Sequence, residues 1–210
     1  MEAAMKNIIL MALGLAILAS PACKGDSSDE GTPGSAVTQM QQNKYSVTTS
    51  GCVEGNCTDG TGTMIQPNGN KYTGQFKNGK PNGSGTAYWS ISGDTYNGTW
   101  KDDMMHGTGT YTFGPRSQWS GDTYTGGWYA DKMHGTGTYT FGPKSQFAGD
   151  KYVGGYKNGK KSGTGTYFWT DGNKYVGGWM DDCMHGRGVF SRKDGTVLKG
   201  TWRFDEYTGK

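Results

Sequence analysis

Aliphatic side chains are scarce in this sequence. Hydrophobic residues of all kinds make up 32% of its 210 residues. From residue 71 to the end, six Ile, Leu and Val residues stand against 26 Tyr, Trp and Phe. This shortage excludes a core of the usual aliphatic kind. Because each aromatic side chain can bury ~150–250 Å², rings must form the core instead.

Residue sets that carry catalysis or bind metals are also missing. No nucleophile, base and orienting carboxylate recur together, so we expect no enzyme activity and no cofactor. His106, His134 and His185 occupy equivalent places, and the first two stand one repeat apart, roughly 10 Å. Ligands of one zinc ion lie within ~2.0–2.3 Å of it, so we expect hydrogen-bonded turn side chains rather than a metal site. The acidic pairs 102–103 and 181–182 offer too few oxygens for calcium.

The N-terminus reads as a separate export segment. An apolar run at 8–19 ends in small residues before Cys23, which predicts a signal peptide over residues 1–22. A cysteine at the cut resembles a lipoprotein in which Cys23 carries the lipid, although Ser20 stands where Leu is usual. Lipidation and simple secretion both stay open. Residues 23–50 are polar, lack apolar periodicity and predict a flexible tether.

Four cysteines fit an exported protein. Cys52 and Cys57 bracket a four-residue turn, so as cross-strand partners they could close a hairpin disulfide. Metal binding by this pair is disfavoured because no second pair completes four ligands. Cys183 is left over, either as a free thiol or as an intermolecular bridge.

A short sequence motif recurs six times along the chain. It consists of an aromatic, a glycine two residues on, a second aromatic, then a turn and Gly-x-Gly. Its leading positions are 72, 96, 124, 152, 175 and 198, so the spacings are 24, 28, 28, 23 and 23 residues. Such a period indicates a repeat array with atypical end units. We divide it into a degenerate cap at 51–70, five units at 71–197 and a C-terminal half unit at 198–210.

Strand alternation within one unit predicts its shape. Tyr124, Gly126 and Trp128 share one face, with threonines on the other. The fold class is therefore all-β, an elongated single-layer antiparallel sheet of stacked β-hairpins. We expect the glycines to make room for a ring from the next hairpin. The rings of this structural spine are Tyr72, Phe76, Tyr96, Trp100, Tyr124, Trp128, Tyr152, Tyr156, Tyr175, Trp179 and Trp202.

Tyr-x-Gly-x-Trp, a short turn and His-Gly-x-Gly together resemble the MORN repeat. The resemblance covers roughly residues 70–204, and Asn82 and Ser162 replace the turn histidine in two units. It implies a surface for protein interaction or scaffolding, and such arrays are also linked to anionic phospholipids.

Two features suggest where a ligand could bind. The two 28-residue units carry lengthened connections whose side chains could form a ridge, unless their rings tuck inward. Basic turns give a second candidate, because residues 71–210 hold 18 Lys or Arg against 12 Asp or Glu; an ordinary solvated surface is the alternative. The candidate ligand-binding residues are Arg116, Trp119, Lys144, Phe147, Lys157, Lys160 and Lys161.

The sequence thus predicts a noncatalytic interaction or scaffolding protein of a bacterial cell envelope. It would be lipid-anchored on the periplasmic or outer-membrane face, with an unidentified protein partner. Binding of anionic phospholipid headgroups is the first alternative, and binding of cell-wall carbohydrate is the second. The chain lacks the Trp-Tyr-Tyr runs of choline-binding-type repeats, which argues against the second. No nucleic acid is expected, and pairing of two copies stays open.

Overall fold

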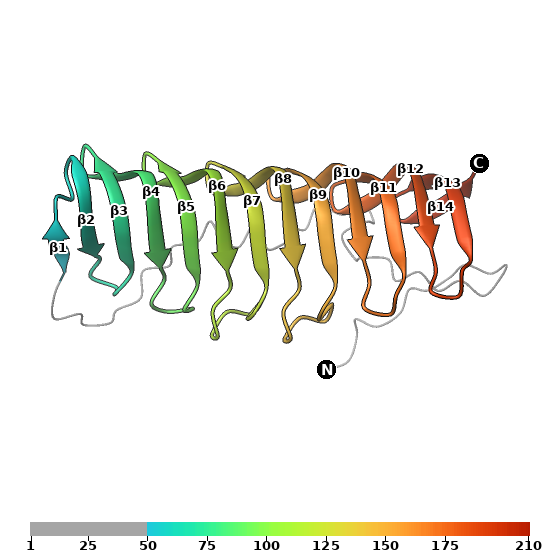
Figure 1. Ribbon diagram of the computed structural model, residues 1–210, viewed down its shortest axis with the longest axis horizontal. Helices are drawn as coiled ribbons and strands as arrows, with labels where there is room; N and C mark the ends of the chain where they lie inside the picture. The colour runs from blue at the N-terminus through green and yellow to red at the C-terminus, as the bar shows by residue number, and fades with distance from the viewer. Residues whose placement is uncertain (1–49) are drawn as a thin grey trace.

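The computed structural model describes residues 50–210, which form one open sheet of 14 antiparallel strands paired in chain order. Figure 1 shows the hairpins standing side by side along an elongated molecule. The predicted fold class is confirmed.

The predicted signal peptide, most of the tether and Cys23 lie outside the described residues. The strands are β1 (Gly51–Gly55), β2 (Gly60–Ile65), β3 (Lys71–Lys77), β4 (Lys80–Tyr88), β5 (Thr95–Lys101), β6 (Met104–Thr112), β7 (Thr123–Tyr129), β8 (Lys132–Thr140), β9 (Lys151–Lys157), β10 (Lys160–Phe168), β11 (Lys174–Met180), β12 (Cys183–Ser191), β13 (Val197–Arg203) and β14 (Glu206–Gly209).

Tight two-residue turns close the hairpins from β3–β4 onward. Both central residues of each turn have positive φ, which is the type I′ geometry that matches the twist of paired strands. Asn, Asp and Gly fill most of these places because they tolerate that conformation best. The turns are Asn78-Gly79, Asp102-Asp103, Ala130-Asp131, Asn158-Gly159, Asp181-Asp182 and Phe204-Asp205.

Each hairpin of the five complete units is bent near its turn. In β7–β8, Gly126 pairs with Gly137 and Trp128 pairs with Met133, so the return strand holds two extra residues. Gly135 lies in this bulge at a φ of 72°, a conformation that favours glycine. The turn ends of the hairpins accordingly fold back behind the sheet (Figure 1). The rings lie inside this bend.

The leading tyrosine of a unit lies on glycines of its own hairpin. A Cβ atom added at Gly137 would stand 2.4 Å from the Tyr124 hydroxyl oxygen. That hydroxyl donates to the carbonyl of Gly127 at 3.0 Å, which fixes the ring across the backbone. The sequence did not predict this ring of the same hairpin, which lies on the glycines because the tyrosine leans along its own strand. The same bond to the carbonyl three residues on is made by Tyr72, Tyr96, Tyr152 and Tyr175.

The next hairpin contributes a tryptophan to the same backbone, as expected of a ring from the next hairpin. Trp128 Nε1 donates to the carbonyl of Gly109 in the preceding hairpin at 3.2 Å. Its ring meets Tyr96 edge-on with centroids 5.3 Å apart, and Tyr124 in the same way at 5.2 Å. This favoured aromatic geometry repeats along the array. All predicted spine rings are buried.

The two ends of the array are closed differently. Cys52 and Cys57 form a disulfide with Cα atoms 5.8 Å apart, but Cys52 pairs with Met64 in the sheet, so the cysteines are not cross-strand partners. At the other end, the expected half unit holds both strands of a hairpin. Cys183 is buried.

We predict that Gly137→Ala destabilises the array strongly. The new methyl group would collide with the Tyr124 ring, and displacing a fully buried ring typically costs about 2–4 kcal/mol. Thr138→Ala, next to it on the outer face, should change the free energy of unfolding by less than about 0.5 kcal/mol. Urea denaturation followed by tryptophan fluorescence measures both. Equal effects would show that no ring lies on Gly137.

Candidate functional site

Aspartates anchor the edge of the sheet where the hairpins are joined to one another. Asp94 Oδ2 accepts a hydrogen bond from the Tyr111 hydroxyl at 2.7 Å, and Oδ1 accepts from the backbone N–H of Gly114 at 2.7 Å. Burial and the neighbouring carboxylate raise the pKa of Tyr111. The same arrangement recurs for Asp122 with Tyr139 and for Asp150 with Tyr167.

Two units lack the tyrosine of this pair, and in both the aspartate is an asparagine. Ala87 stands in the tyrosine place of one unit, with Asn70 before it, and Phe190 stands there in the other, with Asn173 before it. Asn70 Oδ1 still accepts from a backbone N–H, that of Ser90, at 3.0 Å. In these two units there is no tyrosine hydroxyl to accept from, so one side-chain oxygen is sufficient. An asparagine amide can therefore replace the aspartate carboxylate.

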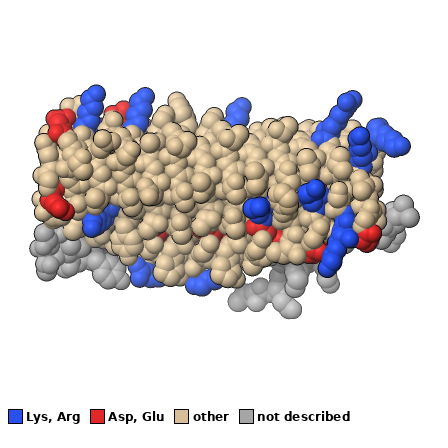
Figure 2. Space-filling view, in the orientation of Figure 1, with Lys and Arg blue, Asp and Glu red and all other residues tan. Residues whose placement is uncertain are grey.

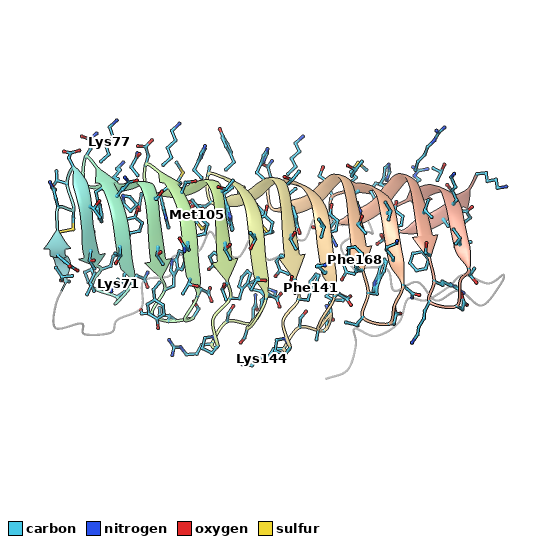
Figure 3. The ribbon with its side chains drawn as sticks, in the orientation of Figure 1. Lys71, Lys77, Met105, Phe141, Lys144 and Phe168 are labelled. Atoms are coloured by element: carbon cyan, nitrogen blue, oxygen red, sulfur yellow. A yellow bond between two sulfur atoms is a disulfide. The ribbon has the colours of Figure 1, made fainter. Side chains whose placement is uncertain are left out.

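The cationic side chains of the lengthened connections bond to the preceding unit. Arg116 donates to the carbonyls of Ser90 and Ile91, and Lys144 donates to the carbonyl of Pro115 at 3.0 Å. Lys144 lies at the loop edge of the sheet, opposite the hairpin turns (Figure 3). Each cationic head thus bonds the loop of the preceding unit.

The rings of these connections turn inward. Trp119 meets Phe113 edge-on at 5.6 Å, and Phe147 meets Phe141 at 5.4 Å. Both loop rings are half-buried. Of the two arrangements predicted for Trp119 and Phe147, inward packing therefore fits the structure better than an exposed ridge.

The acidic turns brace one hairpin against the next. Asp131 Oδ1 accepts from the backbone N–H of Met105 at 2.8 Å, and Asp182 Oδ1 accepts from that of Lys161 at 2.9 Å. The Asp131 N–H returns a bond to the Met105 carbonyl at 3.1 Å. These carboxylates serve the backbone, which explains aspartates in the turns without invoking calcium.

The histidines do not behave as expected. His106 and His134 pack against Tyr129, with ring centroids 5.1 and 5.7 Å away, and His185 packs against Phe204 at 4.9 Å. The Nδ1 atoms of His134 and His185 are buried and have no hydrogen-bond partner among the described residues. Their role is ring packing, so the prediction of hydrogen-bonded turn side chains was wrong for these two.

Lys161 was expected on a basic turn surface but belongs to the ring face. Its Nζ lies 4.7 Å from the Trp179 ring centroid, 5.0 Å from Tyr167 and 5.7 Å from Tyr152. Strand pairing places it opposite Tyr156, where other units hold methionine. Burial lowers the pKa of the Lys161 ammonium, although the Asp182 carboxylate acts in the opposite direction. Lys157 is exposed and Lys160 is half-buried, so only these two remain of the expected basic cluster.

A cavity of about 110 Å³ lies on the ring face of the first complete unit. Tyr72, Trp89 and Trp100 contribute rings to its wall, and Pro81 and Ala87 also line it. It occupies the region where Tyr111, Tyr139 and Tyr167 stand in later units.

The outer face changes character along the array. Over β6–β8 it carries threonines in register, such as Thr110 beside Thr125, whose hydroxyls lie 3.0 Å apart. Over β9–β13 it carries large exposed apolar side chains. These form the outer apolar patch, Val153, Phe168, Val176 and Val197.

Neither a metal cluster nor a membrane-spanning helix is found between residues 50 and 210. No group of three or more His, Cys, Asp or Glu side chains there could hold an ion. No helix there has the length and hydrophobicity needed to cross a bilayer.

Comparison with protein families gives five matches to the MORN repeat, at residues 72–93, 96–118, 124–146, 152–174 and 175–197. The chain belongs to the MORN-repeat family. Each match begins at the leading tyrosine of one complete unit, so the family repeat and the structural hairpin coincide. MORN repeats are generally associated with protein or membrane interaction. No curated protein matches the chain.

Residue-by-residue reading missed two features of this MORN array. One is the inward place of Lys161, and the other is the cavity beside Ala87. Aligning the units would have shown both, because Met105, Met133 and Met184 mark the place of Lys161 as internal.

We predict that Lys161→Met stabilises the protein by about 1–2 kcal/mol at neutral pH. Methionine is the residue that three other units hold at this place, and replacing a charge held against rings by a matched apolar group is often stabilising. Lys157→Met, on the exposed turn, should change stability by less than about 0.5 kcal/mol. Urea midpoints compare the variants. A clear loss of stability in Lys161→Met would show that the contact between ammonium and rings is a net favourable one.

Alkaline pH should unfold the array cooperatively. Burial raises the pKa of Tyr72 to about 12 and that of Tyr96 and Tyr124 further, whereas an unfolded tyrosine titrates near 10. A raised folded pKa gives stability that is complete below pH ~10 and is lost as the pH rises through the folded values. Tyrosinate absorbance and circular dichroism should therefore change together above pH ~10. Full tyrosine ionisation near pH 10 with the sheet intact would contradict this.

Proposed function

We propose that this protein is a noncatalytic interaction module that binds a protein partner through its outer apolar patch. The exposure of that patch is the observation that supports the proposal. Val153, Phe168, Val176 and Val197 are 41, 37, 44 and 57% exposed. Monomeric soluble proteins seldom expose contiguous apolar surface without a use for it.

The register of the sheet places the patch residues in two neighbouring rows, with polar side chains between them. Val153 pairs with Thr166, and Thr166 pairs with Val176 on the next strand. Two residues further along β10, Phe168 pairs with Lys151 on one neighbouring strand and with Lys174 on the other. The Lys151 ammonium stands 4.9 Å from the Phe168 ring centroid. An apolar centre with cationic neighbours fits a partner whose apolar side chains are flanked by acidic ones.

The ring face offers much less surface for a partner. Its tyrosines and tryptophans pack against one another from β3 to β13 and are buried. Arrays of this kind usually bind along an extended face. The outer face is the one whose side chains remain exposed.

Export and lipid anchoring belong to the same proposal. They rest on the apolar run at 8–19 and on Cys23 after small residues. A polar tether would let an anchored array stand clear of the membrane surface. Metabolic lipid labelling of the native protein, lost in Cys23→Ala, tests this part separately.

Anionic phospholipid is a second candidate ligand, favoured by the lysines of the hairpin turns. Lys77, Lys101, Lys132 and Lys157 are exposed. Figure 2 shows that Lys and Arg lie mainly along the long edges of the molecule, and Figure 3 places Lys77 on the turn edge. A row of cations along one edge would attract anionic lipid in a salt-dependent way.

We predict that Phe168→Glu with Val176→Glu abolishes partner binding. Charges at the centre of the patch would be desolvated by a docked partner, so recovery should fall at least about tenfold. Thr125→Glu with Thr140→Glu places the same charges at the same diagonal spacing on β7 and β8, and it should leave recovery unchanged. Chemical cross-linking in envelope extracts followed by mass spectrometry measures the partner.

Equal recovery by both double variants would overturn the role of the patch. Salt-sensitive binding to anionic vesicles without any patch-dependent protein would favour the lipid alternative instead.

A further inference from the structure

The cavity of the first complete unit arises where two space-filling side chains are missing together. The first place holds Tyr111, Tyr139, Tyr167 or Phe190 in later units and Ala87 here. The second holds the residue opposite the second aromatic of the hairpin, which is Met105, Met133, Lys161 or Met184 in later units and Pro81 here. Both Ala87 and Pro81 line the cavity.

Two polar side chains at the cavity also differ from their counterparts. Asn70 lines it where the units with a tyrosine at the place of Ala87 carry aspartate. Asp103 lines it as well, and its counterparts Asp131 and Asp182 each accept a hydrogen bond from a backbone N–H of the preceding hairpin. Proline has no N–H, so Pro81 cannot make that bond to the Asp103 carboxylate. The departures of this unit therefore converge on one cavity.

The hairpin β9–β10 of the fourth complete unit shows what this space can hold. There the ammonium of Lys161 stands among Tyr152, Tyr167 and Trp179 at 4.7–5.7 Å from their ring centroids. Asp182, whose Oδ2 is buried, lies at the adjoining turn. The counterparts at the cavity are Tyr72, Trp100 and Asp103, with Trp89 nearby. In that hairpin the chain supplies its own cation, whereas the cavity offers the same kind of surroundings without one.

The two lysines beside the cavity do not exclude the binding of a cation in it. Lys71 and Lys80 line the cavity and are exposed. Their counterparts beside Lys161 are Lys151 and Lys160, so the same pair of charges is tolerated next to a bound ammonium. Exposed charges are also screened by salt.

We propose that this cavity binds an organic ammonium group with a small apolar body. Aromatic rings attract ammonium through their negative faces, and the Asp103 carboxylate complements the charge. The cavity is small, about 110 Å³, which suits a compact ammonium group rather than a large ligand.

The test titrates the purified protein with tetramethylammonium and n-butylammonium, and with tert-butanol as a neutral probe of similar size. The indole N–H resonances of Trp89 and Trp100 report binding. We expect saturation by an ammonium probe in the millimolar range and at least about fivefold weaker binding of tert-butanol. Preference for n-butylammonium identifies a lysine side chain of a partner as the source, and preference for tetramethylammonium identifies a quaternary ammonium compound; either result supports the proposal.

Two variants refill the cavity by different means. Ala87→Tyr with Asn70→Asp restores the pair found in other units, and Pro81→Lys supplies an internal ammonium as Lys161 does. Both should lose binding while keeping the sheet, as circular dichroism reports. Ala148→Tyr adds the same ring at an exposed loop alanine and should bind normally. Equal affinity for tert-butanol, no saturation by either ammonium, or undiminished binding in a folded refilled variant would overturn the proposal.

Discussion

The contact between a tyrosine ring and a cross-strand pair of glycines is the interaction on which this structure depends. The Tyr124 hydroxyl stands where a Cβ of Gly126 or Gly137 would be, at 2.6 and 2.4 Å. Only glycine permits that approach, and the ring then covers backbone that aliphatic side chains would cover in an ordinary domain. The hydroxyl is satisfied by the Gly127 carbonyl, so burial leaves no unpaired polar group at this ring. Every complete unit repeats this solution.

Because the ring and glycine positions are fixed, differences between units are confined to a few other places. The place of Met105 accepts a methionine, a lysine or a proline, and the place of Tyr111 accepts phenylalanine or alanine. Such changes alter charge and volume on the ring face without disturbing strand pairing, since the register is the same in all five units. The outer face varies independently, from threonine over β6–β8 to valine and phenylalanine over β9–β12. One scaffold can thus carry separate sites on its two faces.

Most of the fold could be predicted because its period and its alternation are both visible in the sequence. The face shared by Tyr124, Gly126 and Trp128 follows from strand geometry alone. Alternation does not give the direction in which a ring leans along its strand, and so the tyrosine of the same hairpin was not predicted to cover the glycines beside the tryptophan of the next one. A bulge shifts the register near the turn of each of these hairpins, and in β9–β10 it falls between Lys161 and Gly165, where the placement of Lys161 was misjudged.

The candidate sites were less accessible to sequence reasoning. Whether Trp119 turns inward depends on its packing with Phe113, which no local pattern specifies. The pairing of Cys52 with Cys57 followed from their spacing, whereas their positions in the sheet depended on the bulge in β1. The cavity beside Ala87 is a property of several units compared together, because it exists only where two fillers are lost at once.

Proton chemical shifts of the glycines test the central claim most directly. Protons held against the face of an aromatic ring are shifted upfield by the ring current. The account predicts strongly upfield-shifted Hα resonances for Gly126 and Gly137, which return to ordinary values in Tyr124→Leu while the glycines of distant units keep theirs. Ordinary shifts for both glycines in the unaltered protein would contradict the account, because no ring could then lie on that backbone.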